Sequence, residues 1–110
     1  MLPSEMTGKD FEFLLTPSDI EISNEDFDRI MTPESMRWVK IEKNNWLYYQ
    51  VDEDEFTYSF EPPGIQMIFN SEISYEKAKK IADEVAKKLT VYAGVEVIVN
   101  LISTDKIIRF

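Results

Sequence analysis

The chain has 110 residues, of which 21 are acidic and 12 are basic, and its formal net charge is −9. It contains no His and no Cys, which excludes disulfides, thiolate nucleophiles, His-dependent catalytic triads and tetrahedral zinc sites. We expect neither a metal nor a cofactor. A single domain over residues 1–110 is predicted, because a chain of this length usually forms one core.

Charge and hydropathy also predict the cellular location of the protein and the class of partner that it binds. The longest run without a charge, residues 62–71, is too short for a transmembrane helix. The first residues lack the basic and apolar regions of a signal peptide, and together with the absence of Cys this predicts a cytoplasmic protein. The acidic balance argues against binding to nucleic acid or to an anionic membrane, since both need clustered Lys and Arg. It favours a basic protein as the partner.

The first predicted elements are a strand and a short helix. Apolar residues recur at every second position over residues 10–15, which predicts the strand. Ser23 is placed to cap a helix over residues 24–31. The acids that follow Ser23 suit the positive end of the helix dipole, which supports this start.

A meander of short strands is predicted next. Its strands cover residues 37–43, 46–51, 56–61 and 65–70. Asn44 and Asn45 predict a two-residue type I′ hairpin, because Asn tolerates positive φ. Gly64 follows two prolines and is expected to accept a strained position in a tight connection.

The longest predicted element is a helix over residues 75–92, with Ser74 as its N-cap and Gly94 at its end. Its apolar stripe consists of Ala78, Ile81, Ala82, Val85 and Leu89. Residues 95–102 are apolar on both faces, which predicts a central strand, and residues 107–110 are a candidate last strand. The expected fold is α+β: a mainly antiparallel sheet of about five to six strands, a long helix packed on one face and a short N-terminal helix.

Negative charge is concentrated in the first part of the sequence. Residues 1–70 hold 15 acids and 5 bases, a net charge of −10, whereas residues 71–110 have a net charge of +1. No base occurs from residue 44 to residue 76, and the densest group of acids, the acidic cluster, occupies residues 52–55. A surface of one sign steers an oppositely charged partner towards it.

The acidic cluster and the tyrosines around it form the candidate binding site. Carboxylates capture Lys and Arg, while Tyr supplies rigid contact area and cation–π interactions. The residues expected to bind the partner are Asp52, Glu53, Asp54 and Glu55, with Tyr48, Tyr49 and Tyr58 as flanking anchors. The alternative is a solvated hairpin turn whose aromatic neighbours lie in the core or in cross-strand pairs.

In size and charge the chain is similar to small acidic proteins that neutralise toxins or nucleases, such as bacterial immunity proteins, although the likeness includes no motif. It implies a non-enzymatic inhibitor that occludes a basic toxin or nuclease domain and is a monomer or a weak dimer. Two alternatives remain open: a structural or assembly subunit of a phage or another complex, and a small enzyme that uses carboxylates.

Overall fold

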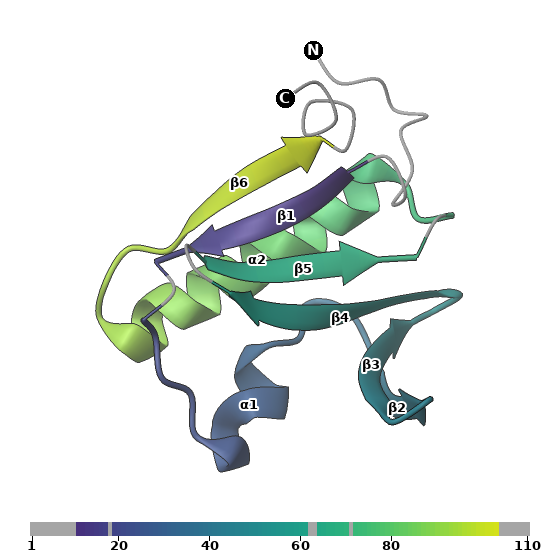
Figure 1. Cartoon of the computed structure of the whole chain (residues 1–110), viewed down its shortest axis with the longest axis horizontal. Helices are drawn as coiled ribbons and strands as arrows, with labels where there is room; N and C mark the ends of the chain where they lie inside the picture. Colours follow the sequence, from purple (N-terminus) through teal and green to yellow (C-terminus); the bar gives the residue numbers. More distant parts are fainter. Residues whose placement is uncertain (1–10, 18, 62–63, 71, 104–110) are drawn as a thin grey trace.

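The structure, a computed structural model, has the predicted α+β fold and describes residues 11–17, 19–61, 64–70 and 72–103. Its elements in chain order are β1 (Phe11–Thr16), α1 (Asn24–Ile30), β2 (Val39–Lys43), β3 (Trp46–Val51), β4 (Asp54–Glu61), β5 (Gly64–Phe69), α2 (Tyr75–Ala93) and β6 (Ile98–Ser103). The six strands form one sheet in the order β2-β3-β4-β5-β1-β6, and every pair of neighbours is antiparallel. Figure 1 shows α2 lying behind β1 and β5.

The core lies between α2 and one face of the sheet. Phe13 of β1 faces Met67 of β5 and Leu101 of β6 in the register, and both Phe13 and Met67 are fully buried. The predicted apolar stripe of α2 is buried throughout its length: Ala78, Ile81, Ala82, Val85 and Leu89. The prediction that the long helix packs on one face of the sheet is confirmed.

The short helix α1 lies beyond β4 and packs against side chains of that strand (Figure 1). The ring centroid of Phe27 is 6.1 Å from that of Tyr58 and 5.9 Å from that of Phe60. Asp28, in the next position, binds the sheet through its carboxylate. This arrangement leaves a cleft between α1 and α2, described below.

Local signals in the sequence explain where the elements begin and end. Asn44 and Asn45 both have positive φ, 53° and 64°, as a type I′ turn requires. The Ser74 hydroxyl accepts a hydrogen bond from the Lys77 amide at 3.2 Å. Gly94 ends α2 with a φ of 77°, and its amide donates to the Thr90 carbonyl. The predicted turn and caps are therefore confirmed.

The structure corrects the position of the last described strand. β6 begins at Ile98 and pairs only with β1 among the described residues, so it is an edge strand and not a central one. Ile98 is 52% exposed, which shows that apolar residues on both faces of a strand do not require burial on both faces. The candidate strand over residues 107–110 lies outside the described residues.

Gly64 is needed for a reason other than the predicted strained turn. A Cβ atom at this position would lie 2.5 Å from the backbone oxygen of Leu15 and 3.0 Å from the Cγ atom of Leu14. Contacts below 3.0 Å are not tolerated by real side chains. Gly64 therefore permits the close approach of β5 to β1.

Candidate functional site

The acidic cluster forms a hairpin between β3 and β4 and is largely paired within the protein. β4 begins at Asp54, two residues earlier than predicted, so only half of the cluster lies in the turn. The Lys77 ammonium, from the first turn of α2, lies 2.7 Å from Asp54 Oδ2 and 3.3 Å from Asp52 Oδ2. Lys43 Nζ lies 2.5 Å from Glu55 Oε1. Bases from other parts of the chain thus neutralise much of the cluster.

The surroundings of the two lysines shift their titration in the same direction. Burial alone would lower the pKa of Lys77, but its hydrogen bonds to Asp54 and Asp52 outweigh burial and raise the pKa. A hydrogen bond to Glu55 raises the pKa of Lys43. Both lysines therefore stay charged near neutral pH. Glu53 is exposed and makes no ion pair among the described residues.

Lys77 is expected to hold the β3–β4 hairpin against α2. In addition to its two ion pairs it donates to the Val51 carbonyl at 3.2 Å. Replacing Lys77 with Met should lower the free energy of unfolding by about 1–2 kcal/mol, because partly buried Asp54 loses its cation. The matched control is Lys79→Met, which removes an exposed pair with Asp83 and should cost less than about 0.5 kcal/mol. Urea denaturation measures both changes, and equal losses would contradict the anchoring role.

Two of the three predicted tyrosine anchors are not on the surface. Tyr49 is 1% exposed, and its hydroxyl donates to Asp28 Oδ1 at 2.6 Å. Tyr58 is 8% exposed, and its hydroxyl donates to the Met31 carbonyl at 2.8 Å. Burial is the main cause of the raised pKa of both groups. The prediction that they flank the site as exposed anchors is corrected, since both lie in the core.

Tyr48, the third predicted anchor, is half-buried on the opposite face of β3. The Lys43 ammonium lies 5.0 Å from the centroid of its ring, within the range of a cation–π contact. The protein's own cation therefore occupies one face of this ring, and the same lysine also binds Glu55.

Among the residues whose side chains are described, the exposed aromatic ones were not predicted as anchors. Trp46 is 50% exposed and Phe60 is 53% exposed, and both line a small cleft of about 200 Å³ together with Leu47. In the described register, β3–β4 pairing ends at Tyr49 opposite Phe56. Beyond that pair, the Thr57 hydroxyl donates to the Leu47 carbonyl and accepts from Trp46 Nε1. This local opening of the sheet exposes the two rings.

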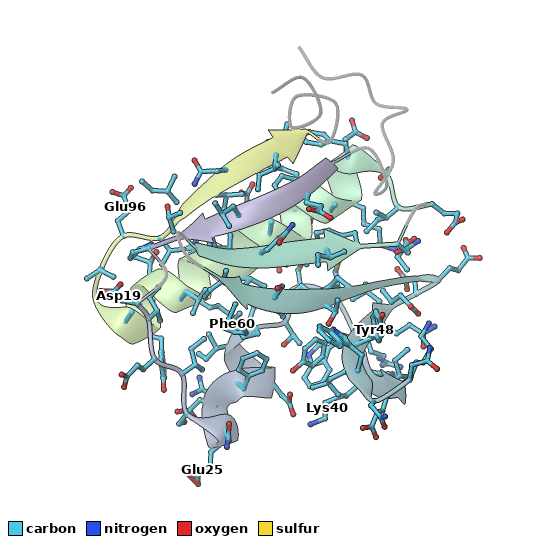
Figure 2. The ribbon with its side chains drawn as sticks, viewed as in Figure 1. Asp19, Glu25, Lys40, Tyr48, Phe60 and Glu96 are labelled. Carbon is cyan, nitrogen blue, oxygen red and sulfur yellow. The ribbon has the colours of Figure 1, made fainter. Side chains whose placement is uncertain are left out.

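Unpaired negative charge lies in the connection before α1, in the first turn of α1 and in the connection before β6. Four exposed acids, here called the unpaired carboxylates, make no ion pair among the described residues: Asp19, Glu21, Glu25 and Glu96. Figure 2 places Asp19, Glu25 and Glu96 on the left side of the molecule, away from the acidic cluster. Ile20 and Ile22 alternate with the acids and pack against the core, which turns the acids outwards.

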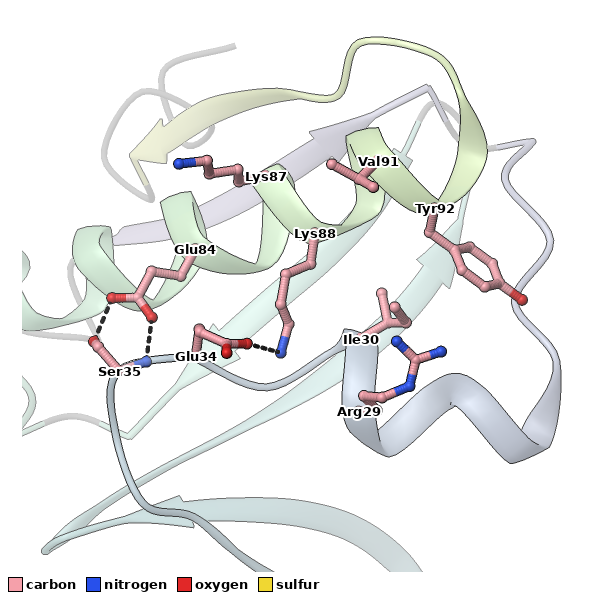
Figure 3. Close-up of a pocket in the computed structure, with 9 residues that line it drawn as sticks. All are labelled: Arg29, Ile30, Glu34, Ser35, Glu84, Lys87, Lys88, Val91 and Tyr92. Carbon is pink, nitrogen blue, oxygen red and sulfur yellow. Dashed lines mark hydrogen bonds and ion pairs between the residues drawn. The ribbon is translucent and has the colours of Figure 1, made fainter.

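A cleft between α1 and α2, here called the α1–α2 cleft, has a volume of about 790 Å³ (Figure 3). Its lining includes Arg29 and Ile30 of α1, Glu34 after α1, and Glu84, Lys88 and Tyr92 of α2. Ser35 fixes one wall, because its amide and hydroxyl bind the two carboxylate oxygens of Glu84 at 2.8 and 2.5 Å. Burial would raise the pKa of Glu84, but these hydrogen bonds outweigh it and lower the pKa. Glu84 therefore remains ionised and in place.

Among the residues that the structure describes, no group of three or more acids could hold a metal ion. No helix in the described ranges is long and apolar enough to cross a membrane. No protein-family model, curated protein or solved structure matches the chain.

Proposed function

We propose that the protein is a non-enzymatic, cytoplasmic binding protein that neutralises a basic partner by occlusion, as an immunity or antitoxin-like inhibitor of a toxin or nuclease domain. The observation that carries the proposal is a surplus of exposed carboxylates that make no ion pair among the described residues, among them Asp19, Glu21, Glu25, Glu53 and Glu96. The net charge of −9 supports it. The partner's Lys and Arg that otherwise hold phosphate would meet these carboxylates, and the partner would lose access to nucleic acid.

Within this proposal the paired and unpaired acids have different roles. Asp54 and Glu55 stabilise the hairpin through Lys77 and Lys43, and breaking those pairs to bind a partner would cost free energy. Carboxylates without a base make new ion pairs without that cost. The exposed rings of Trp46 and Phe60 replace Tyr49 and Tyr58 as candidate aromatic contacts, because exposed aromatic residues dominate binding energy at interfaces.

The partner is found by affinity capture on the immobilised protein at low salt, followed by elution at high salt. The eluted protein is then assayed for nuclease or toxin activity with and without equimolar inhibitor. We expect a basic protein whose activity is blocked in a one-to-one complex. A captured protein that is not basic, or that stays active in the complex, contradicts occlusion.

Association kinetics with that partner test the charge mechanism. Three variants each remove two charges: Asp19→Asn with Glu21→Gln, Asp52→Asn with Glu53→Gln, and the control Glu76→Gln with Asp83→Asn on α2. At low salt, at least one of the first two double variants should slow association about fivefold. The control variant should slow it less than about twofold. Stopped-flow fluorescence measures the rates. Association that is insensitive both to salt and to all three pairs would rule out electrostatic steering.

A structural or assembly subunit is the second candidate, and the edge of β6 that no other described strand pairs with favours it. Ile98 and Leu101 of this strand are at least one-third exposed, and the strand carries no charge that would discourage pairing with another chain. Sedimentation velocity over a wide range of concentrations separates the two candidates. Discrete oligomers that grow with concentration support an assembly subunit, whereas a monomer at all concentrations supports the inhibitor.

A further inference from the structure

The α1–α2 cleft concentrates positive charge in an otherwise acidic protein. Its lining contains three bases and two acids: Arg29, Lys87 and Lys88, and Glu34 and Glu84. Two hydrogen bonds from Ser35 hold the ionised carboxylate of Glu84 in place, and Glu34 is exposed. The lining therefore has a net charge of +1, opposite in sign to the net charge of −9 of the whole chain.

Two of these cations, Lys88 and Arg29, come to the lining from different helices, and each makes a weak ion pair. The side chain of Lys88 is mostly buried, and its ammonium lies 3.5 Å from the carboxylate of exposed Glu34, a long distance for an ion pair. Figure 3 shows Lys88 reaching from α2 towards Glu34, and the guanidinium of Arg29 of α1 below Ile30. Arg29 Nη2 binds Asp26 at 2.9 Å in a pair that is also exposed. Exposed pairs contribute little stability, so an incoming anion displaces them at low cost.

Apolar side chains continue the cleft away from these cations. Ile30 forms part of the lining and is itself almost fully buried, whereas Val91 is 81% exposed. The Tyr92 hydroxyl donates to Asp26 Oδ2 at 3.1 Å, which fixes the ring beside the cleft. The volume of about 790 Å³ falls in the range of roughly 300–1,000 Å³ that is typical of sites for small molecules.

We propose that the α1–α2 cleft binds a small molecule in which one carboxylate or phosphate group is joined to an aromatic or aliphatic body. The anionic group would lie between Lys88 and Arg29, and the body would contact Ile30, Val91 and Tyr92. This site differs from the proposed partner surface in both place and sign of charge. Its test therefore does not depend on whether the protein inhibits a basic partner.

Three probes separate the contributions of the anion and of the body: 1-naphthyl phosphate, inorganic phosphate and 1-naphthol. Amide NMR spectra of the labelled protein are recorded during titration with each probe at low salt. We expect 1-naphthyl phosphate to cause saturable shifts in α1 and in the second half of α2, with at least about tenfold higher affinity than either other probe. Shifts that never saturate, or that lie outside the cleft, would overturn the proposal.

Variants distinguish this site from general electrostatic attraction. Lys88→Gln should lower the affinity for 1-naphthyl phosphate about tenfold, whereas Glu34→Gln should raise it about threefold because it frees Lys88. The matched control is Lys79→Gln, which removes the same charge from α2 outside the cleft lining and should leave the affinity within about twofold. Equal losses for Lys88→Gln and Lys79→Gln, or a loss for Glu34→Gln, contradict the site. Thermal denaturation of each variant confirms that the fold is retained.

Discussion

Replacing Gly64 with Ala is expected to lower the free energy of unfolding by about 3 kcal/mol, which corresponds to a fall in Tm of roughly 12 °C. The new methyl group would meet the backbone oxygen of Leu15 at 2.5 Å, and a backbone atom held in a sheet cannot rotate away. β5 and β1 pair at Leu15 opposite Ile65, and both side chains are fully buried. Relief of the clash therefore has to separate two core strands. Calorimetry and urea denaturation measure the loss.

Gly94→Ala is the matched control for this prediction. Gly94 has a φ of 77°, but a Cβ atom there would meet nothing within 4 Å. Its substitution therefore costs only the left-handed backbone conformation, about 1 kcal/mol, whereas the substitution at Gly64 costs space. If Gly64→Ala proved no worse than Gly94→Ala, the close approach of β5 to Leu15 would not limit stability.

The second large effect is expected at Asp28, which joins α1 to the sheet. Its two carboxylate oxygens accept from the Tyr49 hydroxyl and from Lys40 Nζ, each at 2.6 Å. In Asp28→Asn the amide can accept from Tyr49, but its NH₂ group then faces the Lys40 ammonium, and two donors oppose each other. We expect a loss of about 2 kcal/mol at neutral pH. A double-mutant cycle with Tyr49→Phe measures the part that depends on the buried hydroxyl.

The pH dependence of this effect has a defined sign. Burial would raise the pKa of Asp28, but hydrogen bonds from Lys40 and Tyr49 outweigh burial and lower the pKa below its ordinary value of 3.8. A lowered pKa in the folded state means that the stabilisation is complete above the ordinary pKa and is lost as the pH falls through the folded value. The difference between the native protein and Asp28→Asn should therefore be largest near neutral pH and shrink in acid. A difference that stayed constant from about pH 7 to about pH 3 would exclude Asp28 as the titrating group.

Helical periodicity and turn chemistry were sufficient to predict the long helix and the first hairpin. Ser74 and Gly94 act on neighbouring backbone groups, so their roles follow from residues a few positions apart. The same holds for Asn44 and Asn45, whose positive φ is a property of the turn itself. Such features depend on local contacts, which a sequence records directly.

The candidate site was harder to predict because its properties depend on distant contacts. Nothing near the acidic cluster in sequence indicates that Lys77 will lie 2.7 Å from Asp54. The orientation of the aromatic residues was also ambiguous, since Trp46, Tyr48 and Tyr49 place aromatic rings on both faces of one strand. Only the packing of α1 against Tyr58 and the loss of pairing beyond Phe56 decide which rings are exposed.

The position of β1 between β5 and β6 sets an order for folding during synthesis. Phe13 leaves the ribosome early, but the residues opposite it in the sheet, Met67 and Leu101, are made much later. β1 therefore has both edges open until β5 has been made, and its apolar side chains are uncovered until α2 follows. Contacts this far apart in sequence slow folding and prolong the time during which a nascent chain can associate with others. The yield of folded protein should therefore depend on the rate at which residues 64–103 are synthesised.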